Sequence, residues 1–199
     1  MDSKEFAAAT AVTVKVTAVS IASYWELDPV HSSVGFSVRH MMISRVHGAF
    51  TKVTANLTLD RALLANSKIT ASIEAASIDT REPKRDEHLR SAEFFDVTVF
   101  PTLTFSSKRL ELVGSTTDQY LLTGDLTMHG ITREIVLTVD SAASEMKDPY
   151  GRVKIGASAT AKLNRKDFGL GWNAALETGG LLVGEDVTIT LDLQFIRKD

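Results

Sequence analysis

The segment VTITLDLQF at residues 187–195 has an apolar side chain at every odd position and a polar one at every even position. This period of two predicts a β-strand with one buried face and one solvated face. Seven more segments alternate in the same way, and they span residues 34–40, 53–59, 69–75, 99–105, 120–128, 135–139 and 153–163. The sequence therefore predicts eight strands.

Several of the connections between these strands are short. His129-Gly130 and the segment 148–151 are typical of tight turns, which join antiparallel neighbours. We therefore expect an all-β fold, either an antiparallel barrel or a sandwich. A ninth alternation at residues 12–18 precedes the main body. It divides the chain into an extension over residues 1–23, which forms an extra strand or an arm, and a barrel domain over residues 24–199.

Two connections are too long for hairpins. The first, residues 78–97, is dense in charge, and we expect a short helical segment near residues 80–96. The second, residues 164–184, contains Phe168, Trp172 and five glycines, which is typical of a flexible loop at the mouth of a barrel.

Composition excludes several classes of function. The chain has 199 residues and a formal net charge of −3, so it lacks the cationic surplus that nucleic-acid binding requires. Because it contains no cysteine, thiolate metal sites and cysteine nucleophiles are excluded. The N-terminal segment is not basic, and no apolar run approaches the ~18 residues that span a bilayer. We therefore expect a cytoplasmic protein.

The size of the inward-facing side chains decides whether a small barrel is filled or hollow. Alanine occupies several positions where a filled interior would carry larger side chains, namely Ala71, Ala75, Ala157, Ala159 and Ala161. One interpretation is an unfilled apolar lumen that suits a lipid. The other is that these alanines lie opposite bulky residues and fit the taper of a filled barrel.

The histidines give little support for a metal site. His40 and His47 are an odd number of residues apart, which places them on opposite faces of a continuous strand. No nucleophile elbow or phosphate-binding glycine loop occurs either. Asp86, His88 and His40 are the residues that an acid/base enzyme would use, although acidic residues near a helix start more often cap the helix.

Cations gather in two places along the sequence, at Arg39, His40, Arg45 and His47, and at Arg81, Lys84, Arg85 and His88. Arginine is suited to bind an anionic head group. The alternative, favoured by composition alone, is an ordinary solvated set of salt bridges with Glu82, Asp86, Glu87 and Glu93.

A series of strings shows a resemblance that covers about residues 24–197. They include Trp25-x-Leu27-Asp28-x-x-His31-Ser32, Val46-x-Gly48-x-Phe50, Ser77-Ile78-Asp79-Thr80, Arg85-Asp86-x-His88-Leu89-Arg90-Ser91, Phe100-Pro101-x-Leu103, Gly124-x-Leu126-Thr127-x-His129-Gly130 and Asn164-Arg165-x-Asp167-Phe168-Gly169. In this order they closely resemble the YceI-like family of lipocalin-like polyisoprenoid-binding proteins.

The resemblance implies an eight-stranded antiparallel barrel of extended lipocalin-like form. It implies non-catalytic binding and carriage of a long-chain polyisoprenoid or quinone-like lipid in the central pore, with no other cofactor and no metal. It further implies a homodimer and at most transient membrane contact. Family members are often periplasmic and linked to stress responses, so a stress-response protein that acts through dimer or partner surfaces is an alternative. The other alternative is a hydrolase or isomerase that uses Asp86, His88 and His40.

Two sets of residues follow from this resemblance as hypotheses. The pore would be lined or closed by Phe36, Val38, Phe50, Ala71, Ile73, Ala75, Phe94, Phe95, Phe105, Leu122, Leu126, Leu137, Ala157, Ala159, Leu163, Phe168, Trp172, Ile189 and Leu191. The head group would be held, or the long loop locked to the barrel, by Arg39, His40, Asp79, Arg81, Arg85, Asp86, His88 and Arg165.

Overall fold

Strands dominate the computed structural model, which describes residues 22–114, 119–142, 144–175 and 181–199. Within them the strands are β1 (Ser23–Leu27), β2 (Ser33–His40), β3 (Ser44–Phe50), β4 (Val53–Leu59), β5 (Lys68–Glu74), β6 (Ile78–Asp79), β7 (Thr102–Leu112), β8 (Tyr120–Met128), β9 (Ile131–Ala142), β10 (Met146–Lys147), β11 (Val153–Asn164) and β12 (Val183–Arg197). One α-helix, α1 (Pro83–Arg90), and three short 3-10 turns (Leu64–Asn66, Ala75–Ser77 and Arg165–Phe168) complete the described elements. The alternation at residues 12–18 lies outside the described residues.

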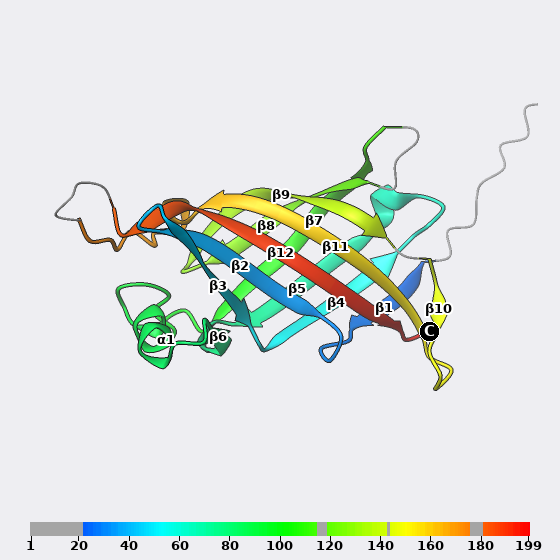
Figure 1. Cartoon of the computed structure of the whole chain (residues 1–199). Coiled ribbons are helices and arrows are strands. Elements are labelled where there is room, and N and C mark those ends of the chain that lie inside the picture. Colours follow the sequence, from blue (N-terminus) through cyan, green and yellow to red (C-terminus); the bar gives the residue numbers. More distant parts are fainter. Residues whose placement is uncertain (1–21, 115–118, 143, 176–180) are drawn as a thin grey trace, which may run out of the picture.

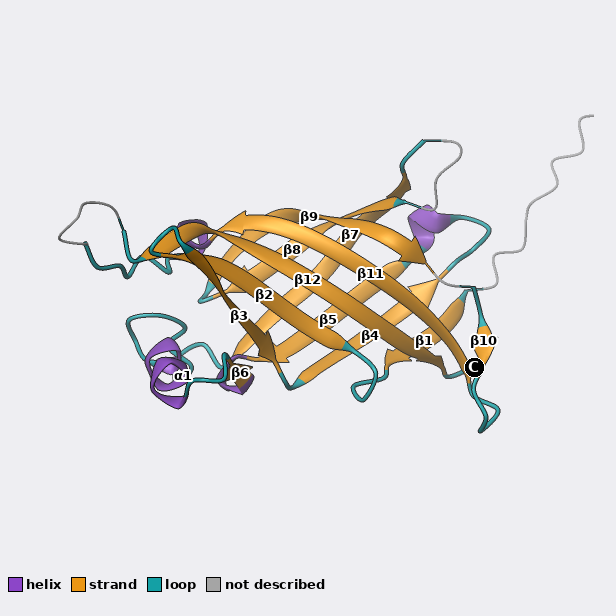
Figure 2. Ribbon diagram, in the orientation of Figure 1, coloured by secondary structure: helices purple, strands orange, loops and turns teal. Residues whose placement is uncertain are grey.

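Eight of these strands close into a ring in the order β1, β4, β5, β7, β8, β9, β11 and β12. Closure occurs because β12 pairs with β11 along one edge and with β1 along the other. Every pairing in the ring is antiparallel. The long strands wind around a common axis in Figures 1 and 2. The predicted eight-stranded antiparallel barrel is therefore confirmed.

One position in the ring is shared by two segments. The last residues of the fifteen-residue strand β12 pair with β1, whereas its earlier residues, from Val183 to Asp192, pair with β2. The hairpin formed by β2 and β3 thus continues the barrel wall beyond the end of β1. The sequence prediction missed β1 and β3, because β1 has only five residues and β3 has a glycine among its inward positions.

The hairpin corrects the prediction for the two histidines. His40 and His47 do not share a continuous strand, since β2 ends at His40 and β3 starts at Ser44. The register pairs His40 with Ser44 and Ser37 with His47. Because directly opposed residues point to the same face, the two rings still face opposite sides of the sheet.

Two predicted strand boundaries were also wrong. The segment 99–105 does not form a strand throughout, because residues 97–99 form a turn and β7 starts at Thr102. Pro101 has no N–H to donate to a ladder, and its carbonyl instead accepts a hydrogen bond from the Ala75 N–H. Ala75 itself lies in a 3-10 turn after β5 rather than in the strand.

The described parts of the two long connections, residues 78–97, 164–175 and 181–184, lie at one end of the barrel. Helix α1 falls within the predicted segment 80–96 and starts with Pro83 at its first turn, where Glu82 caps the Lys84 N–H. In Figure 1, α1 and the β2–β3 turn lie at the end of the barrel opposite to β10. The turns at His129-Gly130 and at residues 148–151 join antiparallel neighbours, as predicted.

Candidate functional site

The interior of the barrel contains a cavity of about 640 Å³. Its wall is formed by inward-facing residues of the ring strands and of the β2–β3 hairpin, because alternate residues of a strand point to the same side. All but three of the residues predicted to line or close the pore border this cavity, namely Phe36, Val38, Phe50, Ala71, Ile73, Phe94, Phe95, Phe105, Leu122, Leu126, Leu137, Ala157, Ala159, Leu163, Ile189 and Leu191. Their role in binding stays a prediction.

The three exceptions are Ala75, Phe168 and Trp172, which do not line the cavity. Ala75 and Phe168 are fully buried in a core cluster at the α1 end of the barrel. Both lie in 3-10 turns, which remove them from the alternation of the strands. Trp172 packs outside the cavity against the rings of His88 and Phe94, with centroid distances of 4.7 and 5.2 Å.

The five inward alanines divide between the two interpretations, because Ala75 and Ala161 are buried in core clusters and do not border the cavity. Ala71, Ala157 and Ala159 line open space rather than the taper of a filled interior. Ala157 pairs with Leu193 on β12, and both residues face the cavity. The small side chains on β11 therefore leave room inside the barrel that larger ones would fill.

Sequence reasoning missed many of the lining residues, especially at the β1 end of the barrel. Leu27, Leu57, Ile155 and Phe195 belong to this group. The polar lining at the same end includes Arg61, Ser67, Lys68 and Ser107. The walls between the two ends are aliphatic and aromatic, so the cavity is chemically suited to an apolar chain.

Aromatic rings cover the α1 end of the cavity. Phe50 on β3 lies edge to face with Phe95, with 5.8 Å between the ring centroids. Phe94 packs against His88 of α1 and against Trp172. These contacts join the helix, the hairpin and the segment after β11 into one cover.

Two of the predicted loop-locking residues, Arg85 and Asp86, meet at Thr80, which the sequence prediction did not single out. Asp86 accepts hydrogen bonds from the Thr80 N–H and hydroxyl, and Arg85 donates to the Thr80 hydroxyl and carbonyl oxygens. Arg90 adds two bonds, to the carbonyls of Ala76 and Ile78. These contacts hold α1 against the end of the barrel, and the role of these residues in the protein's function stays a prediction.

Arg165 is the cationic residue of the predicted set that borders the cavity. It is 4% exposed and donates Nε to the Gly184 carbonyl at 3.0 Å and Nη1 to the Leu170 carbonyl. Its Nη2 has no hydrogen-bond partner among the described residues. Burial lowers the pKa of this guanidinium, and the nearby Glu185 carboxylate opposes that shift.

The other predicted polar residues do not converge on the cavity. Arg39 and His40 lie at the end of β2, and Asp79 accepts a hydrogen bond from the Arg81 N–H at 2.7 Å in an exposed turn. His88 pairs with Glu93 outside the barrel. That pair is the one member of the predicted salt-bridge set that forms within the described residues.

The acid/base constellation is not assembled. Asp86 is buried and bonded to Thr80, His88 contacts Glu93, and His40 lies on β2. No hydrogen bond or ion pair joins any two of Asp86, His88 and His40 in the described part of the chain. No group of three His, Asp or Glu side chains among the described residues could hold a metal ion. In those same segments no helix has the length and hydropathy to cross a membrane.

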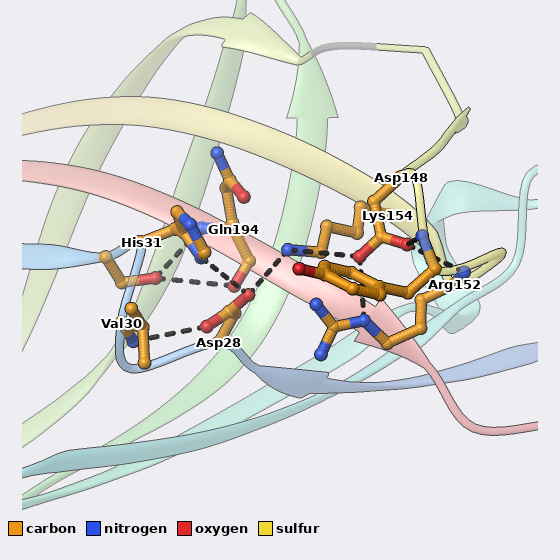
Figure 3. A network of polar contacts seen from close by, with 9 residues as sticks. Asp28, Val30, His31, Asp148, Arg152, Lys154 and Gln194 are labelled. Carbon is orange, nitrogen blue, oxygen red and sulfur yellow. Dashed lines mark hydrogen bonds and ion pairs between the residues drawn. The ribbon is translucent and has the colours of Figure 1, made fainter.

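A polar network on the outside of the barrel was also missed (Figure 3). Asp28 follows β1 and accepts hydrogen bonds from the Val30 N–H at 3.1 Å and from Lys154 Nζ at 2.7 Å. His31 Nδ1 lies 3.0 Å from the same carboxylate. These partners, Lys154 above all, lower the pKa of Asp28 to about 2. The network ties the start of β11 to the turn after β1.

A closed antiparallel barrel of eight strands around an apolar cavity defines a lipocalin-like protein. The model of the YceI-like domain matches residues 25–195. The chain therefore belongs to the YceI-like family, as its sequence strings indicate.

A relative agrees with this assignment, and two solved structures share the fold. A UPF0312 protein of Staphylococcus aureus (strain N315) is 34% identical over 168 residues, which cover 84% of this chain and 94% of the relative. The crystal structure of BcnA from Burkholderia cenocepacia is similar with a TM-score of 0.73 and 23% identity, covering 84% of this chain and 98% of BcnA. A polyisoprenoid binding domain from Saccharophagus degradans, implicated in plant cell wall breakdown, has a TM-score of 0.61 and 14% identity, covering 89% of this chain and all of that domain.

Proposed function

We propose that this protein binds a long-chain polyisoprenoid or quinone-like lipid in the barrel cavity and carries it without chemical change. The observation that carries the proposal is the cavity of about 640 Å³, whose lining runs from Leu57 near β1 to Phe94 beside α1. A long apolar chain matches walls of this length and composition better than a compact polar metabolite does.

The energetics favour carriage over permanent storage. Each buried methylene-like group contributes about 0.8 kcal/mol relative to water. A bilayer buries the same chain equally well, so the net affinity over membrane is small. A protein with this balance takes up the lipid and releases it again.

One of the similar structures indicates which ligands to test first. The domain from Saccharophagus degradans is named for polyisoprenoid binding, and it shares the fold of this chain. At 14% identity the likeness extends to the fold alone. The ligand class therefore rests on the apolar lining of this cavity, with the named ligand of that domain as the reason to test isoprenoids first.

The experiment is native mass spectrometry of the purified chain, followed by organic extraction and identification of the released lipid. A stoichiometric isoprenoid or quinone would support the proposal. An empty protein should take up an added long-chain polyprenol with one-to-one stoichiometry. An empty protein that takes up no polyprenol would overturn the proposal. A stoichiometric lipid of another class would overturn the proposed ligand class and name a different one.

A further inference from the structure

The turn between β2 and β3 exposes three consecutive apolar side chains. Met41, Met42 and Ile43 are 40%, 66% and 78% exposed. The Met41 N–H donates to the Leu182 carbonyl at 2.8 Å, and the preceding residue, Leu181, is also exposed. We call Met41, Met42 and Ile43 the apolar tip. An exposed apolar cluster at the end of a hairpin carries a free-energy cost in water.

The backbone of the apolar tip is strained as well. Met41 and Met42 have φ angles of 50° and 60°, and the Ile43 N–H donates to the His40 carbonyl. Turns with two central residues at positive φ strongly favour Asn-Gly, because bulky side chains disfavour this region. The turn between β8 and β9 uses His129-Gly130 at φ angles of 52° and 73° and so places a glycine at its second position. The apolar tip uses methionine at both.

The charges next to the apolar tip are unbalanced. Arg39 lies directly opposite Arg45 in the register of β2 and β3, and both side chains are exposed. Like charges at opposed positions destabilise a strand pair. Neither arginine has a carboxylate within ion-pair distance among the described residues. The acidic residues nearest along β12, Glu185 and Asp186, already pair with Lys166 and Lys162.

Three local conflicts occur at one place, namely exposed methionines, left-handed backbone and two opposed arginines without a carboxylate partner among the described residues, where Arg45 donates only to the Ser37 hydroxyl at 3.2 Å. Together they point to a partner that relieves them. Such a partner must offer an apolar phase for the methionines and negative charge for the arginines. An anionic bilayer surface offers both at the required depth, because apolar side chains enter the acyl boundary while arginine remains at the head groups.

We propose that the β2–β3 turn is a membrane-docking element, in which the apolar tip inserts into an anionic lipid surface and Arg39 and Arg45 contact the head groups. Docking there places one end of the cavity at the membrane. Val38 and Val183, which both line the cavity, lie next to the turn, and Val183 pairs with His40. The contact is transient, since three side chains and two charges anchor weakly.

The test is cosedimentation of the full chain with vesicles of phosphatidylcholine alone and with vesicles that are equimolar in phosphatidylcholine and phosphatidylglycerol. The natural chain should bind the anionic vesicles and bind the neutral ones much less. Its binding to the anionic vesicles should weaken as the salt concentration is raised. Each arginine near an anionic surface strengthens binding about fivefold, so the Arg39→Gln/Arg45→Gln double variant should bind roughly 30-fold more weakly.

The Met41→Asn/Met42→Gly variant separates docking from a structural role. It supplies the residues that the turn geometry favours, so its melting temperature should equal or exceed that of the natural chain. Its binding to anionic vesicles should fall by at least about tenfold, because the apolar side chains are gone. A merely structural role for the two methionines would leave vesicle binding unchanged.

Met146 on β10 provides the matched control, because it is also an exposed methionine, 69% exposed, at the opposite end of the barrel. Met146→Asn should bind vesicles like the natural chain. Vesicle binding that survives Met41→Asn/Met42→Gly would overturn the proposal, as would an equal loss in Met146→Asn. The apolar tip could instead join two copies of the chain. A natural chain that binds no vesicles and forms a dimer, which the Met41→Asn/Met42→Gly variant dissociates, would also overturn the proposal.

Discussion

Oδ1 of Asp86 accepts two hydrogen bonds from Thr80, one from its backbone N–H at 2.9 Å and one from its hydroxyl at 2.5 Å. Both residues are buried. Arg85 donates Nε to the same hydroxyl oxygen at 2.7 Å, so the Thr80 side chain both donates and accepts. The carboxylate therefore fixes the first turns of α1 to the segment after β6, and it does so without facing the cavity.

Removal of the Asp86 carboxylate should destabilise the fold. Asp86→Ala leaves two buried donors of Thr80 without their acceptor, which costs about 1–3 kcal/mol of unfolding free energy. Asp86→Asn should cost less, because its amide oxygen can accept the same two bonds. Urea unfolding of the three proteins measures this order. An Asn variant as unstable as the Ala variant would show that the negative charge, rather than the acceptor geometry, stabilises this contact.

The sequence predicted every ring strand except β1, because the alternation of the other seven is long and regular. The nine-residue segment 187–195 and the eleven-residue segment 153–163 lie wholly within β12 and β11. The prediction missed strands β1 and β3 for physical reasons. The five residues of β1 give too few alternations to be recognised. In β3 the inward residue Gly48 removes an apolar position from the pattern. A side chain cannot replace it, because a Cβ there would lie 2.4 Å from the nearest ring carbon of Phe36.

The candidate site was predictable in its side-chain chemistry but not in its geometry. Whether Ala157 faces a void depends on the register of β11 against β12, which no local pattern encodes. The role of Thr80 depends on its contacts with Asp86 and Arg85, which the sequence pattern does not encode. Ala75 and Phe168 were misplaced because 3-10 turns interrupt the strand period at both positions.

Stability should depend on the ionisation of Asp28 in acid. Its pKa is lowered from 3.8 to about 2, mainly by the hydrogen bond from Lys154, and the side chain is 6% exposed. A depressed folded-state pKa stabilises the fold above the unfolded value, and this contribution is lost as pH falls through 3.8 towards 2. The unfolding free energy should lose about 2 kcal/mol from this group over that interval.

Comparison with Asp28→Asn isolates this contribution from that of other carboxylates. The difference in unfolding free energy between the natural chain and the variant should be constant above about pH 5 and shrink by about 2 kcal/mol near pH 2. Chemical unfolding at a series of pH values measures it. A difference that does not change with pH would mean that Asp28 titrates alike in the folded and unfolded chains.

Trp172 should slow the exchange of a bound lipid. Its ring packs against His88 and Phe94, and such aromatic pairs contribute about 0.5–1.5 kcal/mol each. Trp172→Ala should therefore speed transfer of a fluorescent polyprenol from the protein to vesicles by roughly tenfold. Trp172→Phe, which keeps an aromatic ring in place, should give an intermediate rate. Equal rates for all three proteins would show that the aromatic cover does not control release.

Filling the cavity should abolish lipid binding while the fold persists. Ala157 lies on the inner face of β11, paired with Leu193, and lines the cavity, so a phenylalanine at this position projects into open space rather than into a packed core. The usual overpacking cost of about 1–3 kcal/mol should therefore be small here. Ala157→Phe should keep the circular dichroism spectrum of the natural chain and fail to take up an added polyprenol in native mass spectrometry.

The control for Ala157→Phe is a phenylalanine on the outer face of the same strand. Thr160 is exposed and lies three residues further along β11, so Thr160→Phe adds the same ring outside the barrel. This variant should bind polyprenol like the natural chain, because the cavity is unchanged. Full uptake by Ala157→Phe would place the lipid elsewhere on the protein. Loss in both variants would trace the effect to β11 itself, and only loss confined to Ala157→Phe assigns the lipid to the cavity.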